Sequence, residues 1–195
     1  MGSHITTFAA TADRWLAGEA AEVLAAQADP SSFGRLYSRY RQRIYAYLLS
    51  RTTTEEDAAD LTQQVFVQAL DALHRYHAGQ ATFAAWLFRI ARNVAVDFHR
   101  RRRATTTWDL IPEALQPKSH ADLPARLIEQ ESLARLRALF MALNPESREL
   151  LTLRFAGQLT APEIASVIGV SEAATRKRLA RLLQSLKERY DDSTD

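Results

Sequence analysis

The segment from Phe83 to Arg103, FAAWLFRIARNVAVDFHRRRR, constrains the fold more than any other part of the chain. Its large apolar residues recur at three- and four-residue spacing, which places them on one stripe of an α-helix. The opposite face carries Arg89, Asn93 and Arg100, and the six arginines of the segment stand against a single acid, Asp97. The pattern predicts a long helix with one buried face and one anion-binding face.

The charges of the chain are segregated although its net charge is only +2. Residues 55–71 are rich in acids, whereas residues 89–103 and 176–189 are rich in arginine and lysine. A solvated outer face on a core helix is the simpler interpretation of a basic stretch, but such faces usually mix both signs of charge. The blocks therefore predict separate partners for separate faces, with nucleic acid as the partner of the basic ones.

Composition excludes several classes of protein. With 195 residues, 47% hydrophobic and 25% charged, the chain has the make-up of a globular protein of one large or two small domains. It has no cysteine, and its five histidines are scattered, so we expect no disulfide, no metal site and no cofactor. No apolar run approaches the roughly 20 residues of a membrane span. We expect a cytoplasmic protein without a membrane contact.

The first part of the chain predicts a helical domain. Residues 1–30 are expected to hold a tag remnant and a helical extension. Helical periodicity then marks Phe33–Leu49, Glu55–Leu73 and the arginine-rich segment. Because the connections between these three segments are short, residues 31–103 are expected to form one three-to-four-helix bundle.

Residues 104–125 are predicted to be a flexible linker because they contain three prolines and no sustained periodicity. A second helical domain is expected over residues 126–190, followed by a tail at 191–195. In this domain Thr160 and Glu163 have capping-box spacing, and Gly169 is placed to make a turn. Ser171 would cap a basic last helix. A capped helix, a glycine turn and a basic second helix are typical of a helix-turn-helix.

Four blocks carry a resemblance to a known family: LYSRYRQRIYAYL, DAADLTQQVFVQAL, FAAWLFRIARNVAVDFHRR and LNPESRELLTLRFAGQLTAPEIASVIGVSEAATRKRL. In order and spacing they resemble an extracytoplasmic-function (ECF) sigma factor of bacterial RNA polymerase, in the sigma-70 family. The resemblance covers roughly Ser31 to Tyr190. It implies an all-α fold of two domains, σ2 and σ4, joined by a linker, and a factor that directs promoter-specific initiation.

The resemblance also implies roles for three sets of residues, with core RNA polymerase (clamp coiled coil and flap) and promoter DNA as partners. The set matched to clamp binding is Asp57, Asp60, Gln63, Gln64 and Phe66. The set matched to the −10 element is His74, Tyr76, Arg89, Arg92, Asn93, Arg100 and Arg101. The set matched to the −35 element is Ser171, Arg176, Lys177, Arg178 and Arg181. Arginine suits bidentate contact with guanine, and a polar pocket suits a flipped base.

The clamp-binding block departs from the family pattern. Many relatives read DAEDLVQEVF where this chain reads DAADLTQQVF, so two acids are missing, at Ala59 and Gln64. We expect weaker docking on the basic clamp. A run of three threonines lies immediately upstream, at Thr52, Thr53 and Thr54. Phosphorylation there by a Ser/Thr kinase would add about −1.5 to −2 charges at a helix N-terminus, with Thr54 or Thr53 the favoured target.

Several alternatives remain open at the level of sequence. The threonine run can equally be a polar loop that supplies an N-cap, and an anti-sigma factor is the other candidate regulator. A two-domain helix-turn-helix regulator that does not bind polymerase would explain the last helix, but would leave the acidic face without a role. A nucleic-acid enzyme would need a phosphate loop or a carboxylate cluster, and neither is visible in the sequence.

Overall fold

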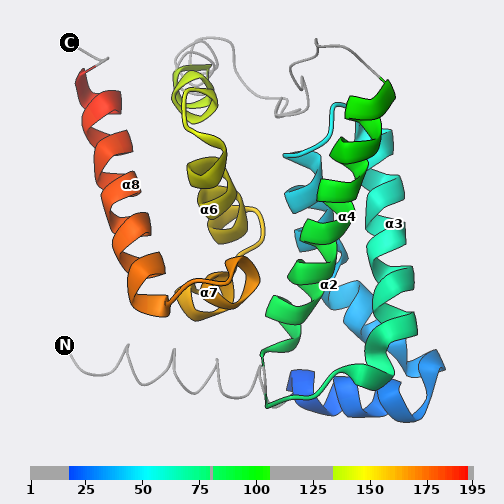
Figure 1. Ribbon diagram of the computed structural model, residues 1–195. Helices are drawn as coiled ribbons and strands as arrows, with labels where there is room; N and C mark the ends of the chain where they lie inside the picture. The colour runs from blue at the N-terminus through cyan, green and yellow to red at the C-terminus, as the bar shows by residue number, and fades with distance from the viewer. Residues whose placement is uncertain (1–17, 80, 106–133, 193–195) are drawn as a thin grey trace, which may run out of the picture.

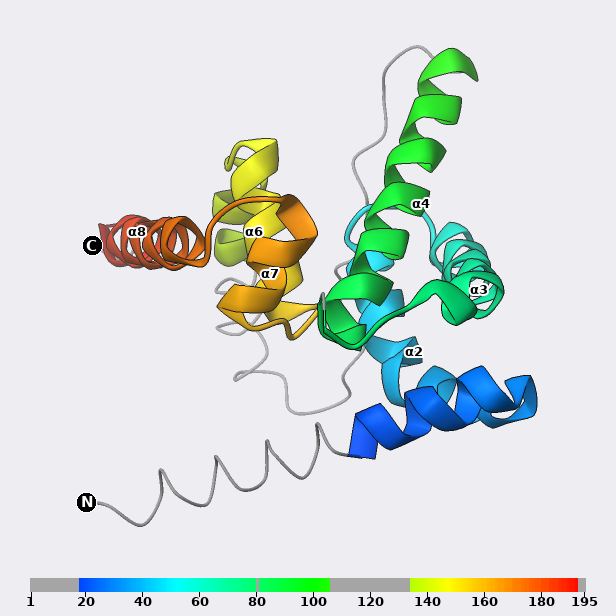
Figure 2. The ribbon, with the colours of Figure 1, turned by 60° about the horizontal axis from the view of Figure 1, so that its bottom comes forward.

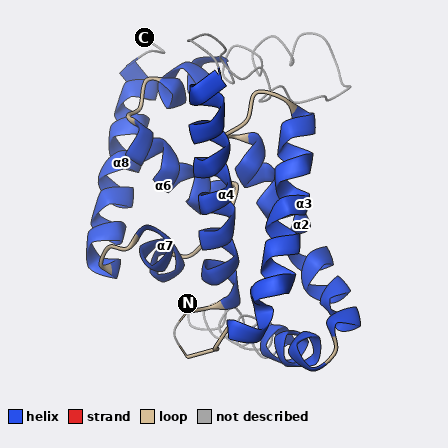
Figure 3. Cartoon of the chain, turned by 45° about the vertical axis from the view of Figure 1, so that its right-hand side comes forward, coloured by secondary structure: helices blue, strands red, loops and turns tan. Residues whose placement is uncertain are grey.

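The computed structural model describes residues 18–79, 81–105 and 134–192, and over these residues the chain contains helices and no strand (Figures 1 and 3). The first domain is built from α2 (Gly34–Leu49), α3 (Glu55–Ala72) and α4 (Phe83–Thr105). The second is built from α6 (Pro145–Phe155), α7 (Ala161–Ile168) and α8 (Glu172–Asp192). The predicted all-α fold class is confirmed.

The periodicity predicted the long helices to within one or two residues at each end. The helix α4 begins at Phe83 as predicted and continues to Thr105, two residues into the segment predicted to be linker. Two short 3-10 turns, η1 (Pro30–Phe33) and η2 (Leu73–Arg75), flank the first two helices. Residues 106–125 of the predicted linker and most of the predicted N-terminal extension lie outside the described residues.

Aromatic side chains fill the core of the first domain, where α2, α3 and α4 pack together. Tyr40 and Tyr47 of α2 are completely buried, as are Phe83 and Phe88 of α4. The ring centroids lie 5.5 Å apart both between Tyr40 and Phe83 and between Tyr47 and Phe88. Trp86, which the apolar stripe of α4 places inward, is partly buried against this core. The stripe identified in the sequence is therefore the buried face of α4.

Residues 18–28 are helical and support the connection between α3 and α4. Gln27 donates two hydrogen bonds from Nε2, to the carbonyl oxygens of Leu73 (3.0 Å) and Tyr76 (2.8 Å). Glu19 is 5% exposed and accepts a hydrogen bond from the Tyr40 hydroxyl. Burial raises the pKa of Glu19 to about 7. This part of the extension, whose role the sequence did not indicate, is a structural part of the first domain.

The helices of the second domain are capped, at α7 and α8 by the residues that the sequence predicts. Asn144 caps α6, and its side chain accepts a hydrogen bond from the Ser147 amide at 2.8 Å. At the start of α7, Thr160 and Glu163 form the predicted capping box, in which the Glu163 carboxylate accepts from the backbone amide of Thr160 at 2.8 Å. The helix α7 ends at Gly169 in the left-handed conformation, with φ +74°. The chain can therefore reverse into α8, because glycine adopts positive φ without steric penalty.

Gly169→Ala is expected to lower the free energy of unfolding by about 1 kcal/mol, because an alanine Cβ is strained at positive φ. Gly34→Ala is the matched control. Gly34 lies in the right-handed helical region (φ −54°), and a Cβ there would meet no atom within 4 Å. It should be neutral or slightly stabilising. Urea denaturation monitored by circular dichroism measures both; an equal effect of the two substitutions would contradict the role of the turn.

The two domains touch along α4 and α7, which lie side by side (Figure 2). The loop after α6 comes so close to α4 that a Cβ on Gly157 would lie 2.8 Å from the Phe88 ring and 2.7 Å from the Leu153 carbonyl oxygen. Only glycine fits at this point. The interdomain contact therefore joins the backbone of the second domain, at Gly157, to the aromatic core of the first domain, at Phe88.

Candidate nucleic-acid interface

The outer face of α4 presents the predicted basic residues to solvent. Arg89, Asn93, Arg100 and Arg101 are exposed, and Arg92 is half-buried. Arg100 Nη2 lies 3.1 Å from the carboxylate of Asp97, which is the one acid on the helix. The exposed arginines run along one side of a rigid helix, an arrangement suited to following a phosphate backbone.

The connection before α4 contributes one exposed and one buried residue. His74 is exposed, and its Nε2 accepts a hydrogen bond from Arg75 Nε at 3.1 Å. Tyr76 was predicted to contact the −10 element, but it is only 6% exposed. Its hydroxyl donates to the Ala81 carbonyl at 3.0 Å and its ring packs against Phe83. In this structure the Tyr76 side chain therefore packs inside the first domain and is not on its surface.

The acidic and amide set on α3 is also only partly on the surface. Asp60 and Gln63 are exposed, and Asp57 and Gln64 are half-buried. Phe66 was predicted to belong to the contact surface, but it is 5% exposed. Its ring packs edge-on against Phe33 at 6.3 Å and Tyr37 at 4.7 Å. The helical period places position 66 next to the apolar stripe, and packing against α2 then buries it.

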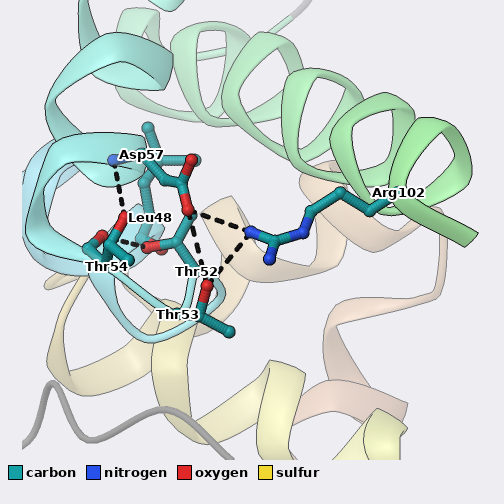
Figure 4. A network of polar contacts seen from close by, with 6 residues as sticks. All are labelled: Leu48, Thr52, Thr53, Thr54, Asp57 and Arg102. Carbon is teal, nitrogen blue, oxygen red and sulfur yellow. Dashed lines mark hydrogen bonds and ion pairs between the residues drawn. The ribbon is translucent and has the colours of Figure 1, made fainter. Parts of the chain in front are cut away.

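Asp57 is engaged in a polar network that spans three segments of the first domain (Figure 4). Arg102 Nη1 from the end of α4 lies 3.0 Å from Asp57 Oδ2 and donates to Thr53 Oγ1, also at 3.0 Å. The Thr53 hydroxyl in turn lies 3.4 Å from the same carboxylate oxygen. The sequence did not predict this network, because its arginine is 45 residues away from the acid.

The three threonines before α3 have different surroundings (Figure 4). Thr52 is 1% exposed, and its hydroxyl donates to the Leu48 carbonyl at 3.2 Å. Thr54 is exposed and caps α3, accepting from the Asp57 amide at 3.0 Å. Thr53 is half-buried, and it alone of the three contacts a guanidinium group. The predicted N-cap role is confirmed for Thr54.

The last helix, α8, exposes four basic side chains near its start. Ser171 precedes α8, and its Oγ accepts a hydrogen bond from the Ala174 amide at 3.2 Å, as the predicted cap requires. The basic side chains that follow are all exposed: Arg176, Lys177, Arg178 and Arg181. Arg176 forms an ion pair with Glu172 one turn earlier. Thr175 and Leu179 are buried on the opposite face, so packing fixes which side of α8 faces outward.

Neither a metal centre nor a membrane helix is found in the described part of the chain. Within residues 18–79, 81–105 and 134–192, no three His, Asp or Glu side chains gather as ligands for a metal ion would. No helix within the same ranges combines the length and the apolar character needed to cross a bilayer.

Two family descriptions match the chain, Sigma-70 region 2 over residues 36–105 and Sigma-70 region 4 over residues 133–186. The ECF RNA polymerase sigma factor SigM of Bacillus subtilis is 31% identical, over 80% of this chain and 93% of SigM. The ECF RNA polymerase sigma factor BldN of Streptomyces coelicolor is 32% identical, over 84% of this chain. The chain spans 62% of the length of BldN.

Solved structures show the same architecture. CnrH, solved in complex with the cytosolic domain of CnrY, is 28% identical to this chain with a TM-score of 0.63, over 89% of this chain and 97% of CnrH. The sigma factor RpoE of Bartonella quintana, solved with the anti-sigma factor NepR, is 20% identical with a TM-score of 0.62 and supports the fold. Its coverage is 82% of this chain and 96% of RpoE. The chain belongs to the ECF sigma factors of the sigma-70 family.

Proposed function

We propose that this factor binds core RNA polymerase and directs initiation at promoters that carry a −35 and a −10 element. The observation that supports this most is the pair of exposed basic surfaces on two separate domains, one on α4 and one on α8. A regulator that reads a single operator needs only the second of them. Sigma factors are not enzymes in general, and we assign no catalytic activity to this chain. We place it in the cytoplasm, where core polymerase acts.

The two basic surfaces would do different work at the promoter. On α8, Arg176 and Arg181 would reach base edges in the major groove of the −35 element, since arginine pairs in bidentate fashion with guanine. On α4, Asn93 would contact an extruded base of the −10 element, and the neighbouring arginines would hold the phosphates of the separated strand. Asp60 and Gln63, the exposed members of the set on α3 that was matched to clamp binding, would dock on the clamp coiled coil. The flap would bind the second domain.

The direct test is promoter-dependent transcription by purified factor and core polymerase. Transcripts that begin at discrete sites, and that are lost when either element is scrambled, are expected. A regulator without polymerase contact would bind the −35 sequence alone and would not migrate with core enzyme on a sizing column. Absence of both co-migration and initiation on a library of templates would refute the proposal.

We also propose that phosphorylation of Thr53 strengthens docking on the clamp. Phosphate there would lie beside Arg102, and charge-assisted hydrogen bonds between guanidinium and phosphate are strong. It would draw Arg102 away from Asp57 and release that carboxylate for the clamp, while adding negative charge at the N-terminal end of α3, the helix that lacks acids at Ala59 and Gln64. Thr52 is too buried to accept a phosphate without local opening, and Thr54 already satisfies the first turn of α3.

Phosphorylation of Thr53 by a Ser/Thr kinase is therefore expected to tighten binding to core polymerase. Thr53→Val, which removes the hydroxyl at nearly constant volume, should abolish the gain. Thr54→Asn is the matched control, because asparagine retains the N-cap while removing the neighbouring hydroxyl. Fluorescence anisotropy of labelled factor with core enzyme measures the affinity. Equal affinity of the phosphorylated and unmodified proteins would contradict the switch.

A protein antagonist is the second candidate for regulation. CnrH was solved with the cytosolic domain of CnrY bound. By analogy, an anti-sigma factor could hold this chain away from polymerase.

A further inference from the structure

Glu149 of α6 inserts its carboxylate into the first domain. Its Oε1 accepts a hydrogen bond from the Tyr47 hydroxyl at 3.1 Å and lies 3.6 Å from Arg92 Nε, and its Oε2 forms an ion pair with Arg51 Nη2. The Glu149 side chain is only 14% exposed and that of Arg51 only 21%. Three donor groups of one domain, from α2, from the turn after it and from α4, thus converge on a single acid of the other domain. We call Glu149, Tyr47, Arg51 and Arg92 the Glu149 cluster.

The Arg51 side chain is held in the Glu149 cluster by its contacts with Tyr47 and Glu149. Its guanidinium stacks over the Tyr47 ring at 4.8 Å, and burial lowers its pKa. Its Nε is buried without a hydrogen-bond acceptor. A guanidinium in such a position is costly unless an anion compensates it, and removing the partner of a buried ion pair is strongly unfavourable. Glu149 is the acid that forms an ion pair with it here.

Further contacts hold the same two domains together. Arg43 donates from Nε to the Gly157 carbonyl at 2.9 Å and from Nη2 to that of Gln158 at 3.3 Å. At the other end of the interface, Thr82 donates to Glu163 Oε1 at 3.0 Å. In these further contacts the Arg43 guanidinium meets neutral carbonyl oxygens, and the Glu163 carboxylate meets the hydroxyl of an exposed threonine. Among the groups in the interdomain contacts described here, Glu149 is the acid whose loss would leave the buried Arg51 guanidinium without its ion-pair partner.

This packing of the domains conflicts with simultaneous binding of two promoter elements. Positions −35 and −10 are about 25 base pairs apart, which is ~85 Å along B-DNA at 3.4 Å per base pair. A compact protein of this length has a radius of gyration of about 16 Å. The domains must therefore separate before α4 and α8 can occupy both elements. Until the domains separate, Arg92, which is predicted to contact phosphate, faces the carboxylate of Glu149.

We propose that Glu149 acts as an internal substitute for a DNA phosphate and locks the free factor in a closed, inactive arrangement. The Glu149 carboxylate is an anion beside Arg51 and Arg92, as a DNA phosphate would be. Promoter phosphate therefore competes with Glu149 for Arg92, and opening is coupled to binding. The coupling to DNA rests on the proposed −10 role of Arg92, whereas the closure itself depends only on the contacts described above.

Energy transfer between dyes on the two domains tests the closure in the intact protein. The chain has no cysteine, so Ser38→Cys on α2 and Ser185→Cys on α8 provide unique, exposed labelling sites. Glu149→Gln is expected to lower the transfer efficiency of the free factor. Glu188→Gln, which removes one acid at an exposed position of the second domain, is the matched control and should leave it unchanged. Unchanged transfer in Glu149→Gln would overturn the lock.

Binding to a fluorescent forked −10 DNA tests the competition. Opening should raise the population able to bind, so Glu149→Gln should bind on the order of tenfold more tightly, against less than about twofold for Glu188→Gln. Arg51→Gln gives a sharper result, because losing a positive charge weakens DNA binding by electrostatics alone, whereas loss of the lock strengthens it. A lower energy-transfer efficiency without tighter DNA binding, in either variant, would refute the competition between Glu149 and promoter phosphate. Transcription by the wild-type factor remains the separate test of the proposed function.

Discussion

Phe88→Ala is expected to lower the free energy of unfolding by about 3–5 kcal/mol, as truncation of a fully buried phenylalanine usually does. The Phe88 side chain is 0% exposed and lies at the centre of the interface described above. Its ring is 5.5 Å from that of Tyr47, and the guanidinium of Arg43 lies 5.7 Å from its centroid. Because Gly157 is already in close contact with the ring, the backbone of the second domain cannot easily collapse into the cavity.

Urea denaturation of the full chain, followed by circular dichroism, measures this loss. Val96→Ala is the matched control, because Val96 lies on the same helix and is 51% exposed. It should cost less than about 0.5 kcal/mol, as surface substitutions generally do. Two transitions in place of one would show that the domains unfold separately and that Phe88 stabilises only the first. A loss below about 1 kcal/mol would contradict the tight packing of the site.

Arg176→Ala and Arg181→Ala are each expected to weaken binding to the −35 element by about 1–3 kcal/mol, which is roughly 5- to 150-fold. Both side chains are exposed on α8, and that helix is held by the buried Thr175 and Leu179. The loss should be confined to particular base pairs, since a bidentate contact distinguishes guanine from the other bases. Binding to a panel of duplexes that vary one −35 position at a time measures the pattern.

Lys187→Ala is the control for general electrostatics, because Lys187 is exposed on the same helix but more than a turn beyond the predicted contact residues. It should weaken all duplexes slightly and equally. The same uniform loss for Arg176→Ala and Arg181→Ala, with a smaller dependence of affinity on salt, would show that both residues touch only phosphate. Other residues of α8 would then have to contact the bases of the −35 element.

The local structure of this protein follows from short-range patterns in the sequence. The apolar spacing along residues 83–103 predicted α4 because a helix places every third or fourth residue on one face. Likewise Asn144, Thr160, Gly169 and Ser171 occupy the ends of helices because their side chains or their backbone freedom satisfy the exposed amides and reversals there. Such effects act over a few residues, so they can be recognised without knowledge of the fold.

The contact sets were less predictable because periodicity does not say how far a residue at the edge of a stripe will be covered. Phe66 and Tyr76 were both predicted to face a partner, and both are buried by neighbouring elements. Phe66 is covered by α2, and the position of Tyr76 is held by its hydrogen bond to Ala81 and by Gln27. The polarity of their neighbours in sequence gave no indication of either contact.

The sequence by itself determined that the chain is all-α, where its helices lie, and which faces of α4 and α8 are basic. The tertiary structure decided which charges remain available. It pairs Asp57 with Arg102 across 45 residues and places Glu149 beside Tyr47, 102 residues earlier in the chain. An ion pair between distant segments depends on how whole helices pack and on how much water that packing removes. The spacing of nearby residues predicts helix formation and capping, but it does not predict the packing of whole helices or the removal of water between them.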